Sequence, residues 1–159
     1  MQHEHEPRIS FLIAGVQKAG TTALSRFLAA HPALYLAKHE SHFFDKDAVD
    51  WDRPDYAPYE KRFRAAKPDQ LVGEKTPIYL FWDHALDRIQ AYNPAIRLII
   101  SLRNPADRAY SHWKMETRRG HETRSFSYAI RDGRARINEH DGGRHTSKRR
   151  FSYVERGFY

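Results

Sequence analysis

A lysine inside a short loop bounded by glycines is the first feature of this sequence that could do chemistry. Gly15 and Gly20 enclose Lys18, and two threonines, Thr21 and Thr22, follow the second glycine. Glycines allow a tight loop whose backbone N–H groups surround a phosphate at the start of a helix. The glycine spacing equals that of a Walker A loop, but no lysine follows Gly20. We expect this loop to bind an anion; a plain strand–helix turn with an exposed lysine is the alternative.

A second group of polar residues follows the apolar run 97–102. Arg103 comes directly after this run, and Ser111 lies about two helical turns further on. Open α/β sheets bind ligands at the carboxyl ends of their strands, and a guanidinium with a hydroxyl suits a phosphate. Asp107 can cap the helix that follows, and a surface ion pair is the alternative role for Arg108. The run ends in Leu-Arg rather than in an aspartate, which argues against an ATPase or kinase.

The elements that must position these residues follow from the apolar pattern. Strands are expected where short apolar runs meet turn signals, at 9–14, 34–36, 70–73 and 97–102. Helices are expected at 21–30, 59–66, 77–91, 107–119 and 125–138. Repeated strand–turn–helix units predict an α/β fold with a central parallel sheet flanked by helices. Residues 140–150 are expected to be mobile.

Composition indicates a globular chain with an anionic partner. The 159 residues are 40% hydrophobic and 30% charged, which suits one domain over residues 1–159. Lys and Arg exceed Asp and Glu by 27 to 20, but this surplus does not identify the anion. The chain has no cysteine, so disulfides and thiolate chemistry are excluded. Neither a membrane span nor a secretory signal is recognisable, and we expect a cytoplasmic location.

Both anion motifs, in this order, resemble those of sulfotransferases that use 3'-phosphoadenosine 5'-phosphosulfate (PAPS). Lys18-Ala-Gly-Thr-Thr is similar to their 5'-phosphosulfate loop. Arg103-Asn-Pro-Ala-Asp-Arg-Ala-Tyr-Ser111 is similar to their 3'-phosphate motif. The match covers about two-thirds of the chain, from Ile9 to Met115. It implies a P-loop-like three-layer fold and a C-terminal part that is absent here.

Two further segments resemble the heparan sulfate branch of that family, which includes glucosaminyl N- and 3-O-sulfotransferases. Glu40-Ser-His42-Phe-Phe-Asp45 is similar to a 3-O-sulfotransferase segment whose glutamate is the catalytic base. Glu74-Lys75-Thr-Pro is similar to a segment whose lysine lies at the reaction centre. The residues alone leave Glu40 and Glu74 as alternative bases, and the resemblance favours Glu40. His42 is expected to orient Glu40 or to contact the acceptor, and Asp45 to hold His42.

The resemblance implies an enzyme that moves a sulfuryl group from PAPS to a hydroxyl or amine of an acceptor. The sulfuryl group carries less negative charge than a phosphoryl group, so lysines suffice and no metal is expected. Glu40, Lys18, Lys75 and His42 are the predicted catalytic residues. The predicted donor-binding residues are Gln17, Lys18, Ala19, Gly20, Thr21, Thr22, Arg103 and Ser111. The expected acceptor is a glycan or a small metabolite, not nucleic acid; a kinase and a non-catalytic polyanion-binding module are the alternatives.

Overall fold

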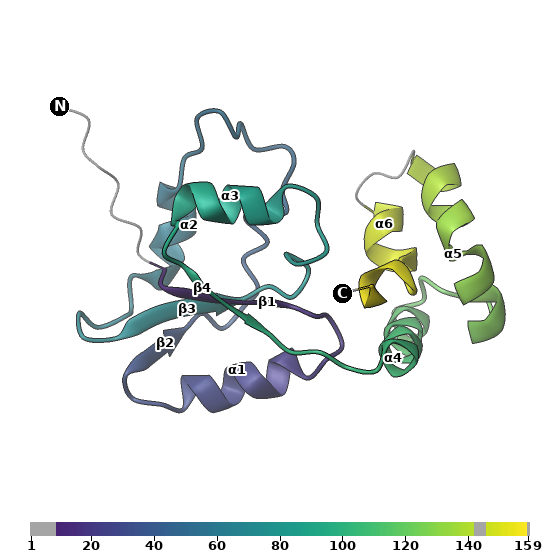
Figure 1. Ribbon diagram of the computed structural model, residues 1–159, viewed down its shortest axis with the longest axis horizontal. Coiled ribbons are helices and arrows are strands. Elements are labelled where there is room, and N and C mark those ends of the chain that lie inside the picture. Colours follow the sequence, from purple (N-terminus) through teal and green to yellow (C-terminus); the bar gives the residue numbers. More distant parts are fainter. Residues whose placement is uncertain (1–8, 142–145, 159) are drawn as a thin grey trace. The chain divides into compact units, whose positions relative to one another are not determined.

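The computed structural model describes residues 9–141 and 146–158 (Figure 1). Four parallel strands form one sheet in the order β2-β3-β1-β4. The strands are β1 (Phe11–Gly15), β2 (Leu34–Leu36), β3 (Leu71–Lys75) and β4 (Arg97–Ile100). The predicted α/β fold with a central parallel sheet is therefore confirmed. All four strands overlap the predicted ones, although β3 continues two residues further, through Glu74 and Lys75.

The two central strands pack closely because one of them carries a glycine. All five residues of β1 are buried, as expected of a central strand. Gly73 of β3 pairs with Phe11 of β1, and a Cβ atom on Gly73 would lie 2.4 Å from the Phe11 ring. The ring therefore occupies the space that any other side chain at position 73 would need.

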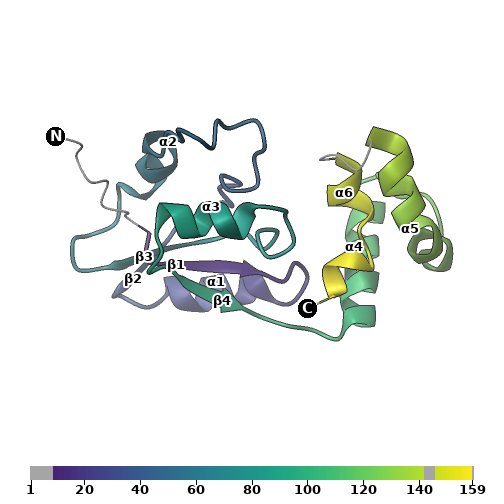
Figure 2. The same cartoon turned by 45° about the horizontal axis from the view of Figure 1, so that its top comes forward.

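Helices cover both faces of the sheet (Figure 1 and Figure 2). Helix α1 (Thr21–Ala29) lies on one face, and α2 (Ala57–Glu60) and α3 (Ala85–Tyr92) lie on the other. A short 3-10 helix, η1 (Lys61–Phe63), continues α2. The core contains many aromatic side chains, among them Phe44, Tyr59, Tyr79 and Tyr92. Phe43 and Phe44, which follow His42 in the predicted catalytic segment, are buried in it.

The helix predicted at 77–91 is wrong over its first half. Residues 77–84 form turns, and α3 begins only at Ala85, after His84 with a φ of 60°. The backbone N–H of Leu80 donates to the carbonyl of Ala14 at 3.0 Å, which ties this segment to β1, and its internal hydrogen bonds form separate turns. The buried residues Ile78, Tyr79 and Trp82 have the spacing of a helix face although they lie in turns, and this spacing led to the wrong prediction.

Three helices follow the sheet in the sequence: α4 (Pro105–Arg118), α5 (Phe126–Asp141) and α6 (Thr146–Phe151). A 3-10 helix, η2 (Glu155–Gly157), comes after them. The N-cap of α4 is Asn104, whose side chain accepts from the N–H groups of Ala106 and Asp107, so the cap predicted at Asp107 is wrong. Within the segment predicted to be mobile, 140–150, α5 ends at Asp141 and α6 begins at Thr146; residues 142–145 lie outside the described ones, and the mobility stays a prediction.

The chain forms two compact units. Unit 1 contains the sheet with residues 1–15 and 20–101, and unit 2 contains the loop Val16–Ala19 with residues 102–159. The single domain predicted over 1–159 stays a prediction, since compact units can belong to one domain. No helix among the described residues is long and apolar enough to cross a bilayer. The cytoplasmic location also stays a prediction.

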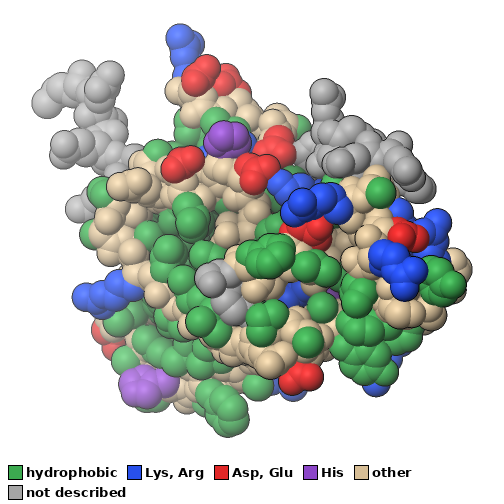
Figure 3. All heavy atoms as spheres, turned by 45° about the vertical axis from the view of Figure 1, so that its right-hand side comes forward, with side chains coloured by type: hydrophobic (Ala, Val, Ile, Leu, Met, Phe, Trp, Pro, Cys, Tyr) green, Lys and Arg blue, Asp and Glu red, His purple; other side chains and the backbone are tan. Residues whose placement is uncertain are grey.

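The basic surplus of the sequence lies in unit 2. This unit holds more than half of the Lys and Arg residues but only about a third of the Asp and Glu residues. On the face of the molecule drawn in Figure 3, Lys and Arg side chains gather on the right, among exposed apolar ones. A ligand of unit 2 is therefore expected to be an anion.

Candidate functional site

The predicted phosphate loop connects β1 to α1 and is held in an unusual backbone conformation. Lys18 has a φ of 75° and Gly20 a φ of 81°. Left-handed conformation is easy for glycine but uncommon for lysine, and such strain is often found at ligand sites. Gly20 is also the N-cap of α1, and no side chain caps that helix. The first N–H groups of α1 therefore have no side-chain acceptor, as an anion-binding helix start requires.

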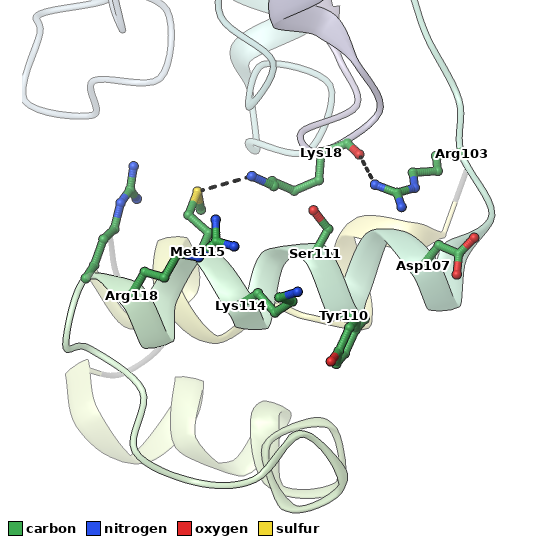
Figure 4. Close-up of a pocket in the computed structure, with 9 residues that line it drawn as sticks. Lys18, Arg103, Asp107, Tyr110, Ser111, Lys114, Met115 and Arg118 are labelled. Atoms are coloured by element: carbon green, nitrogen blue, oxygen red, sulfur yellow. Dashed lines mark hydrogen bonds between the residues drawn. The ribbon is translucent and has the colours of Figure 1, made fainter.

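Lys18, Arg103 and Ser111 lie together in unit 2 (Figure 4). They line a cavity of about 550 Å³ between the loop and α4. Nη1 of Arg103 donates to the carbonyl of Lys18 at 3.2 Å, and the Ser111 side chain points toward the loop. The other lining residues come from α4 and its end: Asp107, Tyr110, Lys114, Met115, Arg118 and Arg119. Five cationic side chains thus face one carboxylate.

The Lys18 ammonium lies in a cationic environment. Its described hydrogen-bond acceptor is Sδ of Met115 at 3.7 Å, and a thioether sulfur is a weak acceptor. Burial lowers the pKa of Lys18, and the neighbouring charges of Arg119 and Arg118 lower it further. An anion entering the cavity would relieve this repulsion between cations and would gain several charge-assisted hydrogen bonds.

Gln17, the other polar residue of the loop, contacts a residue that the sequence did not single out. Its side-chain oxygen accepts from Nη1 of Arg156. Arg156 is 3% exposed and also donates to Ser152 Oγ at 2.8 Å and to the Arg149 carbonyl at 2.6 Å. Gln17 is thus held by the segment around η2. Ala19, also predicted to bind the donor, is buried, and its N–H donates to the Val16 carbonyl at 3.1 Å.

Two polar residues of α4 are buried. The alternative of a surface ion pair for Arg108 is wrong, because its side chain is fully buried and donates to the Tyr153 carbonyl. His112 is also fully buried, and its ring nitrogens have no hydrogen-bond partner among the described residues. Burial holds the pKa of His112 well below its usual range, with a further contribution from Arg156. A neutral imidazole is thus part of the core of unit 2, with its ring 4.8 Å from that of Tyr153.

The predicted catalytic residues Glu40, His42 and Lys75 lie together in unit 1. Nζ of Lys75 is 2.7 Å from Oε1 of Glu40, and Nε2 of His42 is 3.3 Å from Oε2. The other ring nitrogen of His42 is 2.9 Å from Oδ2 of Asp45, which is fully buried. The contacts expected between His42, Glu40 and Asp45 are therefore present. Lys75 also donates to Thr22 Oγ1 at 3.4 Å.

Contacts within the group of Glu40, His42, Lys75 and Asp45 stabilise the charged forms of Glu40 and His42. Hydrogen bonds that the His42 ring donates to Asp45 and Glu40 raise the pKa of His42 to about 9, so the imidazole is protonated at neutral pH. Burial raises the pKa of Glu40, but the hydrogen bonds from His42 and Lys75 outweigh it and leave the pKa lowered. Glu40 is thus an ionised, half-buried carboxylate held between two cations, able to accept a proton from a bound hydroxyl.

Glu74, the alternative base, lies in a different environment. Its side chain is fully buried, and its Oε1 accepts a hydrogen bond from the Tyr59 hydroxyl at 3.2 Å. Burial raises the pKa of Glu74, although hydrogen bonds from Ser41 and Tyr79 oppose the rise. An acceptor hydroxyl cannot reach a carboxylate that is 0% exposed in this arrangement, so the geometry favours Glu40.

The predicted site residues therefore form two groups, one in each compact unit. Lys18, Arg103 and Ser111 line the cavity of unit 2, whereas Glu40, His42, Lys75 and Thr22 cluster in unit 1. Thr21 is buried in the first turn of α1. Among residues 9–141 and 146–158 no three His, Asp or Glu side chains gather as metal ligands. The roles assigned to these residues, and the metal-free reaction, stay predictions.

A parallel sheet with a glycine-bounded loop between a central strand and a helix is the arrangement of a P-loop-like α/β protein. Residues 8–132 match the family of the sulfotransferase domain, and the chain belongs to this family. It is 34% identical over 122 residues to the human and mouse heparan sulfate glucosamine 3-O-sulfotransferase 5, which covers 74% of this chain and 33% of theirs. The mouse heparan sulfate glucosamine 3-O-sulfotransferase 6 is 39% identical over 64% of this chain and 29% of its own.

A solved structure has the same fold. The crystal structure of a sulfotransferase from Alicyclobacillus acidocaldarius superposes with a TM-score of 0.80 and 28% identity, covering 96% of this chain and 65% of that one. The chain spans about a third of the length of the curated relatives it matches. The predicted resemblance to sulfotransferases, with the heparan sulfate branch among the similar proteins, is thus confirmed.

Proposed function

We propose that this chain binds PAPS and transfers its sulfuryl group to a hydroxyl of a carbohydrate. The observation that carries the proposal is the shared cavity of Lys18, Arg103 and Ser111 in unit 2. A lysine at a strained loop position, a guanidinium and a hydroxyl suit a nucleotide with phosphates at both its 5' and 3' ends. ATP has no 3'-phosphate, so the proposed use of Lys18 for the 5' end and of Arg103 with Ser111 for the 3'-phosphate distinguishes PAPS from ATP.

The proposed transfer is an in-line displacement at sulfur. The acceptor oxygen forms a bond to sulfur while the bond from sulfur to the 5'-phosphate oxygen breaks, and 3'-phosphoadenosine 5'-phosphate (PAP) leaves with the electron pair. Glu40 takes the proton of the acceptor hydroxyl, and the neighbouring His42 and Lys75 keep this carboxylate ionised until then. Lys18 and Lys75 stabilise the negative charge that grows on the leaving and sulfuryl oxygens.

The proposed acceptor class rests on the relatives. The similar curated proteins are named for the sulfation of glucosamine in heparan sulfate, which is a carbohydrate. A carbohydrate hydroxyl fits a carboxylate base, because its proton must leave as the bond to sulfur forms. The surplus of cations in unit 2 is compatible with an acidic glycan as well as with the donor.

Calorimetry with PAP, ATP and ADP tests the donor site. We expect the chain to prefer PAP, and Lys18→Ala to weaken PAP binding by about tenfold to a hundredfold, as loss of a charge-assisted hydrogen bond predicts. Lys61→Ala, which removes an exposed lysine of unit 1, should leave the affinity unchanged. Preference for ATP over PAP would favour a kinase instead. Equal, strongly salt-dependent binding of all three would favour a polyanion-binding module.

A further inference from the structure

The two amides that flank His42 are both held by side chains from the segment after β3. The N–H of Ser41 donates to Oγ1 of Thr76 at 3.2 Å, and the N–H of Phe43 donates to the hydroxyl of Tyr79 at 3.1 Å. The Tyr79 hydroxyl also lies 2.9 Å from Oγ of Ser41. One buried tyrosine oxygen therefore contacts the chain on both sides of His42.

Tyr79 is itself fixed by the core. Its side chain is fully buried, and its ring stands edge-on to that of Phe44 with centroids 5.6 Å apart. A close-packed core leaves such a ring little freedom, so its hydroxyl is a rigid anchor point. Burial raises the pKa of Tyr79 far above its usual range, and the hydroxyl is neutral and available for hydrogen bonds.

His42 needs such an anchor because its backbone is strained. Its φ is 49°, a left-handed conformation that is uncommon for any residue except glycine. Strain of this kind persists only when the surrounding structure holds it. In this conformation the imidazole lies between Glu40 and Asp45, at 3.3 Å and 2.9 Å from their oxygens. Release of the backbone would therefore separate the ring from one or both carboxylates.

We infer that Tyr79 is the positioning residue of the Glu40 group: its hydroxyl holds the backbone N–H of Phe43 and the side chain of Ser41, one on each side of His42, so that the imidazole stays between Glu40 and Asp45. Tyr79 is fully buried and acts through the loop. As a contribution to turnover, this role rests on the proposed function of Glu40. As a contribution to the geometry of His42, it can be measured without any substrate.

The test compares Tyr79→Phe with a matched control, Tyr92→Phe. Tyr92 is buried in the same aromatic core, and its hydroxyl donates to Oε1 of Glu60 at 2.7 Å, away from the His42 loop. Both variants lose one buried hydroxyl and keep the ring. NMR titration of His42 should give a pKa of about 9 in the wild-type chain and in Tyr92→Phe. In Tyr79→Phe it should fall toward the ordinary value of 6.5.

Turnover and donor binding provide the second measurement. Tyr79→Phe should lower kcat for sulfuryl transfer on the order of tenfold to a hundredfold, because a small misplacement of catalytic groups has effects of this size. Its affinity for PAP should match that of the wild type, since Lys18, Arg103 and Ser111, which line the proposed donor cavity, belong to unit 2. Ser41→Ala removes the contact of the Tyr79 hydroxyl with Oγ and should act in the same direction, which keeps the test open if Tyr79→Phe does not fold.

Two results would overturn the inference. One is a His42 titration in Tyr79→Phe that coincides with that of Tyr92→Phe. The other is a parallel loss of PAP affinity and turnover in Tyr79→Phe, since the effect would then not be confined to the loop. A wild-type chain that transfers no sulfuryl group would contradict the proposed function, but the NMR comparison would still decide the role of Tyr79.

Discussion

The ammonium of Lys75 lies 2.7 Å from Oε1 of Glu40, although 35 residues separate them in the sequence. Lys75 is the last residue of β3, and Glu40 lies in the loop after β2. Since β2 and β3 are parallel neighbours, their carboxyl ends meet at one edge of the sheet. The sheet topology therefore creates this pair, and it fixes the place where the proposed acceptor would give up its proton.

Replacement of Glu40 by glutamine tests its role as the base. Glu40→Gln keeps the size of the side chain but removes the charge that accepts the proton. We expect kcat for sulfuryl transfer to fall by about 10²–10⁴, the usual contribution of a general base. PAP affinity, measured by calorimetry, should remain unchanged. Asp87→Asn, which changes a carboxylate that is 83% exposed, is the control. Full activity of Glu40→Gln would remove Glu40 from the mechanism.

The stability of the loop should depend on pH through His42. Hydrogen bonds that the His42 ring donates to Asp45 and Glu40 raise the pKa of His42 to about 9 in the folded chain, against the ordinary value of 6.5. The protonated form is thus favoured by folding, so its stabilisation is complete below 6.5 and is lost as pH rises through 9. The difference in free energy of unfolding between wild type and His42→Gln, from urea titrations, should shrink over this range. A difference that grows with pH would contradict this assignment.

Ser111 should distinguish nucleotides by their 3'-phosphate. Ser111→Ala removes one hydroxyl from the cavity that Arg103 and Lys18 share. Loss of a hydrogen bond to a charged group should weaken PAP binding by about tenfold. Binding of AMP, which has only the 5'-phosphate, should not change. Thr117→Ala, on the same helix but outside the cavity lining, is the control. An equal loss for both nucleotides would place the 3'-phosphate elsewhere.

Much of the fold could be predicted because its signals are local. β1 and β4 follow from short apolar runs, and α1 follows from apolar residues on one helix face. The motifs of the site could be recognised for a similar reason, since Lys18 and Glu40 each lie in a short segment directly after a strand. Local patterns of this kind survive in the sequence whatever the rest of the chain does.

The remaining features depend on contacts between distant segments. The buried face of α4 consists of Arg108, Ala109, His112 and Glu116, so a search for apolar residues cannot recognise it. Residues 77–84 form turns because the N–H of Leu80 donates to the carbonyl of Ala14 in β1. This contact cannot be predicted from the local sequence. The partner of Gln17 is Arg156, near the other end of the chain. The helical spacing of these buried α4 residues is the one signal in the sequence that indicates a buried face. Their polar and charged side chains make that face look like a solvent-exposed one.

The close approach of β1 and β3 gives a prediction about stability. A Cβ atom in Gly73→Ala would lie 2.4 Å from the Phe11 ring, so the ring or the strand must move. Forcing extra atoms into a packed core costs about 1–3 kcal/mol, and we expect the free energy of unfolding to fall by this amount. Phe11→Leu makes room at the same place, and it should recover part of the loss when it is combined with Gly73→Ala. Thermal and urea unfolding of the two single variants and the double variant would measure this coupling. Strictly additive losses would mean that the Phe11 ring does not limit the residue at position 73.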